Sequence, residues 1–245
     1  ISLPYDAEFG GIKCLNLHGI DSCIFKDKAN YVHIINMDSK NDSYYNTSIY
    51  NATRQTVPAI GDIDDDGNLE AVFWFNENND NRYGLMVFDL VERKLDSGFN
   101  GIGVIDGIIN PYQGNFALKG HSVLVDLNND KKLEIAVSVF YDEFQNYEWA
   151  TDWFTELFVF SSDGAKLFSR CGSNHVRGDC NGINFQPDQW EGTNPFILDY
   201  DKNGMDDICF IKDKKGIAGF EYMGLNCYNY SGYELADVNL SAIES

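Results

Sequence analysis

A nine-residue acidic segment occurs three times in this chain and constrains its fold more than any other feature. The copies span 62–70, 126–134 and 199–207, so their starts lie 64 and then 73 residues apart. In each copy an oxygen-bearing side chain stands at positions 1, 3, 5 and 9. Alternate side chains of a curled loop can point inward together, and Ca²⁺ takes six or more oxygen ligands. The spacing predicts three cation-binding loops, with the position-7 carbonyl as a further ligand.

Each acidic segment is followed directly by a strand rather than a helix. An EF-hand requires a bidentate Glu at position 12 and a helix on each side. Position 12 is here occupied by Phe73, Val137 and Phe210, within apolar runs rich in β-formers. We therefore expect the last ligand of each loop to be the first residue of a strand. The alternative interpretation is three solvated acidic turns, which would have to recur three times in the same context.

The loops divide the chain into four repeat units within a single domain, 1–245. We expect the units to span about 1–54, 55–115, 116–190 and 191–245. Cys23–Lys28 resembles Cys209–Lys214. The segment before it, Leu15–Asp21, keeps an acid before the strand but has lost the other carboxylates, so the first unit is degenerate and no metal is expected there. Several short strands per unit, at a period above 50 residues, predict an all-β fold of β-propeller-type blades. Helical periodicity is absent, although Asp142–Asp152 is compatible with a short helical turn.

The segment Gly120-His121-Ser122-Val123-Leu124-Val125-Asp126-Leu127-Asn128-Asn129-Asp130 resembles the FG-GAP/VCBS repeat, the blade unit of integrin α-subunit heads and many secreted propellers. The resemblance covers 55–75, 115–140 and 192–211. It implies one Ca²⁺ per blade in a rim loop, about three in all. The ligand side chains it implies are Asp62, Asp64, Asp66 and Glu70; Asp126, Asn128, Asp130 and Glu134; Asp199, Asp201, Asn203 and Asp207. The carbonyls of Asn68, Lys132 and Met205 would fill position 7.

Two features depart from that family. Lys131 stands where Gly is expected, which weakens the second site if this residue must adopt a positive φ. Four units are also too few for the seven-bladed ring typical of the family. The sequence therefore predicts an incomplete or unusually small propeller, completed elsewhere or closed differently. An open array of repeats exposes unpaired edges, so head-to-tail assembly with copies of itself is one expectation.

Charge limits the partners of the chain. It carries 38 Asp and Glu against 18 Lys and Arg, a formal net charge of −20. Three Ca²⁺ would change this to −20 + 6 = −14, so we expect calcium to contribute to stability. The negative charge argues against nucleic acid as a partner. No run approaches the ~20 apolar residues of a membrane helix, so no membrane insertion is expected. The first residue is Ile1, and we expect a processed or trimmed chain.

Cysteines and glycosylation sequons favour the outside of the cell. The six cysteines fall into close pairs, Cys14 with Cys23, Cys171 with Cys180 and Cys209 with Cys227, although six cysteines allow fifteen pairings. Disulfides persist in oxidising compartments. Five Asn-x-Ser/Thr sequons, at Asn41, Asn46, Asn51, Asn229 and Asn239, are consistent with passage through the secretory pathway. We expect an extracellular or cell-surface glycoprotein.

We find no nucleophile or zinc-protease motif and do not expect an enzyme. Our first expectation is an adhesion or recognition module that binds a protein or glycan through rim loops. The Arg177-Gly178-Asp179 tripeptide, between Cys171 and Cys180, is a hypothetical adhesion motif or merely a closed surface turn. One alternative is a structural subunit of an extracellular filament. Another is a lectin or carbohydrate-active enzyme that uses the aromatic residues Tyr141, Tyr147, Trp149, Trp153 and Trp190.

Overall fold

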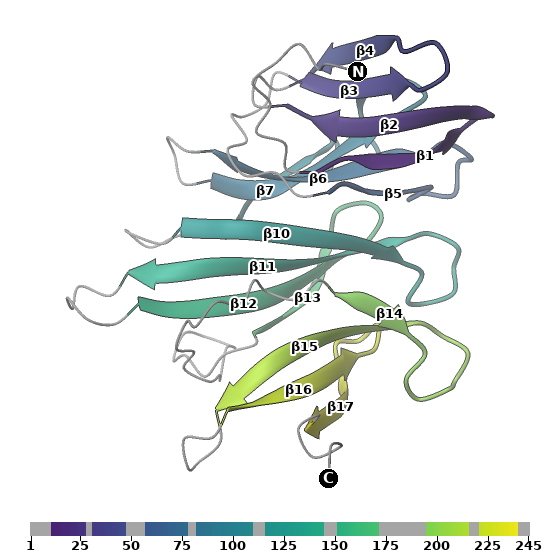
Figure 1. Cartoon of the computed structure of the whole chain (residues 1–245). Helices are drawn as coiled ribbons and strands as arrows, with labels where there is room; N and C mark the ends of the chain where they lie inside the picture. Colours follow the sequence, from purple (N-terminus) through teal and green to yellow (C-terminus); the bar gives the residue numbers. More distant parts are fainter. Residues whose placement is uncertain are drawn as a thin grey trace. The chain divides into compact units, whose positions relative to one another are not determined.

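The chain forms antiparallel β-structure throughout the part that the structure describes. The computed structural model describes residues 11–27, 31–47, 57–77, 82–109, 116–144, 151–171, 195–215 and 221–239. These ranges contain seventeen strands and no helix (Figure 1). The all-β prediction is therefore confirmed. The alternative of a helical turn is wrong at both ends of its segment, because Asp142–Phe144 belongs to one strand and Thr151–Asp152 to the next. Among the described residues, no helix is long and apolar enough to cross a membrane.

The strands form four sheets, each an antiparallel meander in chain order. The first sheet contains β1 (Lys13–Leu17), β2 (Ile20–Lys26), β3 (Tyr31–Asn36) and β4 (Asp42–Asn46). The second contains β5 (Ala59–Gly61), β6 (Glu70–Glu77), β7 (Arg82–Asp89) and β8 (Lys94–Leu95), with β9 (Val104–Ile109) also paired to β7. The third contains β10 (Phe116–Val125), β11 (Glu134–Phe144), β12 (Thr151–Phe160) and β13 (Lys166–Cys171). The fourth contains β14 (Phe196–Leu198), β15 (Asp207–Lys215), β16 (Glu221–Tyr228) and β17 (Glu234–Asn239).

The chain divides into two compact units, each with its own core. The first unit comprises residues 1–62 and 66–110, and the second comprises 63–65 and 111–245. In the first unit, Ile24 and Val32 of the first sheet pack in one cluster with Phe73 and Phe88 of the second. In the second unit, third-sheet residues such as Val159 share a cluster with Ile208, Phe210 and Tyr228 of the fourth sheet. Consecutive sheets within each unit are thus joined by apolar side chains.

The acidic loops lead into strands that are buried on both faces. Ala71 to Phe75 in β6 are each at most 1% exposed, and Ile135 to Val137 in β11 are fully buried. A strand covered on both faces reads as a continuous apolar run rather than an alternating one. These runs follow the acidic loops directly in the sequence, and the structure confirms them as strands.

The connections between the third and fourth strands share a turn in all four sheets. Each opens with a residue whose side-chain oxygen accepts backbone N–H groups two to four positions later: Asn36, Asp89, Ser161 and Asn229. Each contains one residue of positive φ: Lys40 (57°), Arg93 (61°), Gly164 (88°) and Gly232 (71°). Such side-chain-to-backbone bonds replace ladder bonds where a chain reverses. The first sheet is therefore built on the same plan as the other three.

The first sheet differs at the connection between its first two strands. The acidic loop is replaced there by a two-residue turn, in which His18 (φ 50°) and Gly19 (φ 85°) both adopt positive φ. Asn16 closes the turn, because its Oδ1 accepts the Gly19 N–H at 2.8 Å and its Nδ2 donates to Asp21 at 2.9 Å. Positive φ at both central residues is the geometry of a type I′ hairpin.

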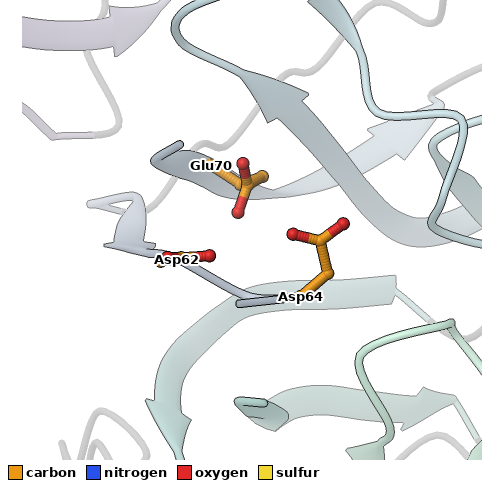
Figure 2. A group of neighbouring side chains, drawn as sticks. All are labelled: Asp62, Asp64 and Glu70. Carbon is orange, nitrogen blue, oxygen red and sulfur yellow. The ribbon is translucent and has the colours of Figure 1, made fainter. Parts of the chain in front are cut away.

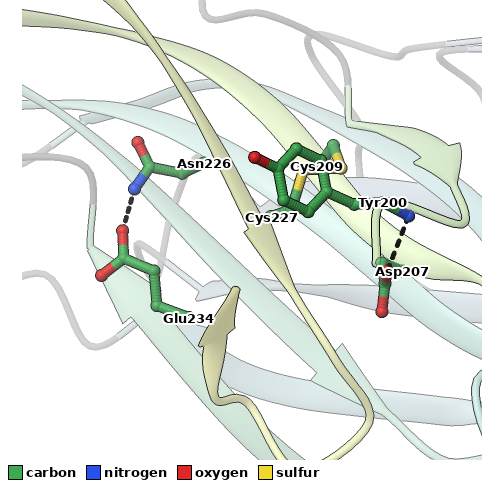
Figure 3. Close-up of a disulfide and its surroundings, with 6 residues drawn as sticks. All are labelled: Tyr200, Asp207, Cys209, Asn226, Cys227 and Glu234. Atoms are coloured by element: carbon green, nitrogen blue, oxygen red, sulfur yellow. Dashed lines mark hydrogen bonds between the residues drawn. A yellow bond between two sulfur atoms is a disulfide. The ribbon is translucent and has the colours of Figure 1, made fainter. Parts of the chain in front are cut away.

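Two of the three expected disulfides are present, each between residues directly opposite on neighbouring strands. Cys14–Cys23 joins β1 to β2, and Cys209–Cys227 joins β15 to β16 (Figure 3). Cys209 and Cys227 are both fully buried, whereas Cys14 is exposed. The third expected pair, Cys171 with Cys180, falls outside the described residues because Cys180 does.

We predict that the Cys209→Ala/Cys227→Ala variant loses roughly 3 kcal/mol of unfolding free energy, because the bond constrains the unfolded chain. The Cys14→Ala/Cys23→Ala variant should lose less, since it releases a separation of 9 residues rather than 18 and only one of its two cysteines, Cys23, is buried. The measurement is the denaturant midpoint of each variant against the parent. An equal loss from both pairs would contradict the expectation.

Candidate metal centres

The first acidic loop brings three carboxylates together between β5 and β6. Oxygens of Asp62, Asp64 and Glu70 lie within 4.8 Å of one another (Figure 2). Asp62 and Asp64 belong to the loop, whereas Glu70 is the first residue of β6 and is only 2% exposed. Three carboxylates at this separation repel one another unless a cation lies among them or a proton is bound. The group therefore has the composition and spacing of a divalent-metal site.

The third acidic loop repeats this arrangement between β14 and β15. Oxygens of Asp199, Asp201 and Asp207 lie within 4.8 Å of one another. Asp207 begins β15 and is 1% exposed. One of its oxygens accepts the Tyr200 N–H at 2.9 Å (Figure 3), which anchors the start of the strand to the second residue of the loop.

The backbone of all three loops is held by the carboxylate at position 1. Its two oxygens accept the N–H groups of positions 5 and 6. The bonds run to Asp62 from Asp66 (3.1 Å) and Gly67 (3.0 Å), to Asp126 from Asp130 (3.1 Å) and Lys131 (2.9 Å), and to Asp199 from Asn203 (3.0 Å) and Gly204 (3.0 Å). The side-chain oxygen of position 5 in turn accepts the N–H of position 7 in each loop.

Positive φ recurs at the same two positions of each loop. Position 4 is Asp65 (62°), Asn129 (61°) and Lys202 (59°), and position 6 is Gly67 (90°), Lys131 (73°) and Gly204 (87°). The three segments therefore follow one backbone path although their residues differ. Lys131 does adopt the left-handed conformation, which glycine accepts without strain and lysine does not.

The second loop keeps this path but holds fewer acids. Glu134, at position 9, accepts the Leu127 N–H at 2.8 Å, just as Asp207 accepts that of Tyr200. The Asn128 amide nitrogen donates to Asp130 at 3.0 Å and to Glu134 at 3.5 Å. A cation bound among these residues would need the side-chain oxygen of Asn128 as a ligand, in the place that the amide nitrogen now takes. Within the described part of the chain, only the first and third loops group three acidic ligands.

The buried carboxylates at position 9 are ionised at a cost. Burial raises the pKa of both Glu134 and Asp207, and the neighbouring acidic residues of each loop raise it further. The hydrogen bonds from Leu127 and Tyr200 act in the opposite direction because they favour the charged form. A divalent cation bound nearby also favours the charged form, so cation binding and ionisation at position 9 support each other.

The remaining predicted ligands lie at the loop surface. The side chains of Asp66, Asp130 and Asn203 are exposed. The direction of the Asn68, Lys132 and Met205 carbonyls stays a prediction, as do the complete ligand sets and the identity of the metal.

Other residues singled out from the sequence are described only in part. Asn41 and Asn46 are exposed, Asn229 is half-buried, and Asn239 is the last residue of β17. The tripeptide Arg177-Gly178-Asp179 lies outside the described residues, as do Asn51, Tyr147, Trp149 and Trp190. Tyr141 of β11 lies opposite Phe154 of β12, and Trp153 of β12 lies opposite Asp142 of β11. The structure thus leaves the adhesion motif and the aromatic cluster as hypotheses.

A buried histidine in the first sheet was not identified from the sequence. His33 is 1% exposed and stacks on Phe25 at 4.5 Å between ring centroids. Its Nδ1 lies 2.9 Å from an Asp42 oxygen, and its Nε2 lies 3.2 Å from an Asp27 oxygen. This group joins β3 to β4 and to the residue after β2. Its three members are separated in sequence and match no local motif.

Neither the comparison with protein-family models nor the comparison with curated proteins finds a match to this chain.

We predict that Lys131→Gly raises the free energy of unfolding by about 0.5–1 kcal/mol, because glycine removes left-handed strain at position 6. The matched changes Gly67→Ala and Gly204→Ala should each lower it by about 1 kcal/mol, since both glycines have positive φ and open space around the missing Cβ. Unfolding is measured in chelator, so that a change in cation affinity does not contribute to the difference. If Lys131→Gly lowered the free energy of unfolding as much as Gly67→Ala does, the idea that the loops share one backbone path would be refuted.

Proposed function

We propose that this protein is an extracellular, calcium-stabilised module of β-propeller type that works by binding other molecules through its loops. The observation that carries the proposal is the acidic loop itself. It occurs three times on one backbone path, and each copy ends in a buried carboxylate that begins a strand. A solvated acidic turn has no need for a buried charge, because burial disfavours the charged form.

The donor set supports calcium over softer metals. The predicted ligands are carboxylate, amide and carbonyl oxygens, and oxygen donors suit Ca²⁺, Mg²⁺ and Mn²⁺ rather than zinc or copper. Nine-residue loops with exposed ligands at position 5 fit the irregular coordination of calcium better than the strict octahedron of magnesium. Calcium at extracellular concentrations fills sites that are too weak to fill inside a cell.

The three loops differ in formal charge, which ranks them as cation sites. The first contains five acidic residues and no basic one. The third contains four acidic residues and Lys202, and the second contains three acidic residues with Lys131 and Lys132. Ligand charge is one of the factors that set calcium affinity. The order of filling in the proposal is therefore first loop, third loop, second loop.

The propeller interpretation is supported by the repetition of one sheet plan. Four meander sheets follow one another in the chain, and the two sheets of each unit share a core. Consecutive sheets joined by their faces are the building principle of a propeller. The loops at one end of such sheets are available for recognition, which is why we place ligand binding there.

We predict that chelation of calcium lowers the melting temperature of the protein. A site with a dissociation constant of roughly 10⁻⁴ M contributes about 2.7 kcal/mol at about 10 mM calcium. For a chain of this size that is a shift of roughly 5–10 °C per site. Differential scanning calorimetry with calcium, with magnesium and with chelator is the measurement. Identical curves in all three buffers would count against the proposal.

Asp207→Asn should abolish the contribution of the third loop, whereas its matched control, Asp206→Asn, should retain it. Both variants remove one negative charge at neighbouring positions, but Asp207 is buried within the carboxylate group and Asp206 is exposed. Isothermal titration with calcium should show one site fewer for Asp207→Asn alone. Equal losses from both variants would mean that charge, not coordination, governs binding.

The recognition role is tested by calcium-dependent binding to immobilised ligands. The protein is applied to a glycan array and to integrin-bearing cells, with calcium and with chelator. Loss of cell attachment in Asp179→Glu would assign binding to the Arg-Gly-Asp tripeptide, and glycan binding that survives this change would assign it elsewhere. Absence of any binding, together with filaments in micrographs, would favour a structural subunit instead.

A further inference from the structure

The third acidic loop contains an asparagine that is followed directly by a glycine. Asn203 and Gly204 occupy positions 5 and 6 of the loop, and both are exposed. Such an asparagine can deamidate without an enzyme, because the backbone nitrogen of the next residue attacks its side-chain carbonyl carbon. Glycine hinders this attack least, since it has no Cβ. Nothing lies within 4 Å of the place that a Cβ of Gly204 would take, so the dipeptide is sterically open.

Hydrogen bonds of the loop hold each group that takes part in such a reaction. The Gly204 N–H, which supplies the nucleophile, donates to an Asp199 oxygen at 3.0 Å. The Asn203 side-chain oxygen accepts the Met205 N–H at 2.7 Å, which folds the side chain over the peptide that follows it. The Asn203 amide nitrogen, the leaving group, donates to Asp201 at 3.0 Å. A proton acceptor, a donor to the developing oxyanion and a partner for the leaving nitrogen therefore surround one amide.

The reaction consumes one water molecule and releases one ammonia molecule. The Gly204 nitrogen forms a bond to the side-chain carbon of Asn203 and gives its proton to the Asp199 carboxylate. The bond from that carbon to the amide nitrogen then breaks, and the nitrogen takes the electron pair and the proton and leaves as ammonia. Water adds to either carbonyl carbon of the resulting cyclic imide. Opening of the ring on one side gives aspartate, and opening on the other side gives isoaspartate.

Among the three acidic loops, the third alone combines the amide with the glycine. Positions 5 and 6 are Asp66-Gly67 in the first loop and Asp130-Lys131 in the second. Both have a carboxylate in place of the amide, so neither can release ammonia. All three loops make the same bond from the N–H of position 6 to the carboxylate at position 1. The difference in reactivity is thus confined to two side chains on one shared backbone path.

We propose that Asn203 is a site of spontaneous deamidation, at which the third loop converts its own position-5 amide into aspartate and isoaspartate while it holds no cation. The dependence on the cation rests on the proposed function. A cation bound by the predicted ligands occupies the oxygens of Asp199, Asp201 and Asn203, so it removes the proton acceptor and fixes the side chain.

The two products change the third loop in opposite directions. Aspartate at position 203 gives the loop five acidic residues, as many as the first loop contains, and the residue type that Asp66 and Asp130 provide at position 5. Isoaspartate adds a methylene group to the backbone, so the bonds from positions 5 and 6 to Asp199 lose their spacing. A loop that stays empty is therefore altered irreversibly.

The connection between β8 and β9 supplies an internal comparison. Asn100 and Gly101 form another exposed pair of the same sequence, and Gly101 also combines positive φ (74°) with open space. The Asn100 amide nitrogen donates to the Val104 carbonyl oxygen at 2.8 Å. Within the described ranges, no carboxylate accepts the Gly101 N–H. This pair thus has the reactive dipeptide without the proton acceptor of the third loop.

The test follows both asparagines in the full chain, which is incubated at neutral pH well below its melting temperature, with chelator or with calcium. Peptide mass spectrometry measures deamidation at each site, and isoaspartyl methyltransferase labelling measures isoaspartate. In chelator we expect Asn203 to react several-fold faster than Asn100, and calcium should slow the reaction at Asn203 alone. Asp199→Asn should lower the rate at Asn203 to about that at Asn100. The matched control Asp206→Asn removes the same charge and should leave both rates unchanged.

Three results would overturn the proposal or one of its parts. An Asn203 that reacts no faster than Asn100 in chelator would refute the site, and equal effects of Asp199→Asn and Asp206→Asn would refute the role of the loop carboxylate. Calorimetry on the same samples separates the site from the calcium proposal. A calcium-dependent melting shift without protection of Asn203 refutes the dependence on the cation. Fast deamidation with neither shift nor protection supports the site and refutes the calcium proposal.

Discussion

The structure depends on a buried carboxylate at the point where each acidic loop becomes a strand. Glu70, Glu134 and Asp207 are at most 2% exposed, yet each begins a strand whose next residues form the core. A charge in this position needs compensation. The chain supplies part of it through loop N–H groups, seen at Glu134 and Asp207. A divalent cation held by the first half of the loop would supply the rest, and would join loop and strand in one step.

The repeated unit is defined by its turns as much as by its strands. Every sheet reverses between its third and fourth strands through the same side-chain-capped turn, including the first sheet, which has no acidic loop. That sheet joins its strands with a two-residue turn, a disulfide and the buried group around His33. The sheet plan is therefore compatible with several kinds of local stabilisation, of which the acidic loop is one.

Features that depend on spacing along the chain could be predicted from the sequence. The three loops, the strands after them and two disulfides each lie within a short segment, so residue type and spacing were sufficient. The shared turn was missed because its positive-φ position holds Lys40 or Arg93 in two sheets and glycine in the others. The contacts of His33 with Asp27 and Asp42 were missed because strand register alone brings them together.

Comparison of the second loop with the other two separates the path of the backbone from the binding of a cation. Asn128 and Lys131 replace the carboxylate and the glycine of the first loop, and the dihedral pattern and the position-1 hydrogen bonds are nevertheless retained. Backbone N–H bonds to the Asp126 carboxylate are therefore retained without a carboxylate at position 3 or a glycine at position 6, and neither of these is required for the path. Cation affinity can then differ from loop to loop while the sheets keep one plan. Under the proposed function, this independence would allow a strong, an intermediate and a weak cation site within the same fold.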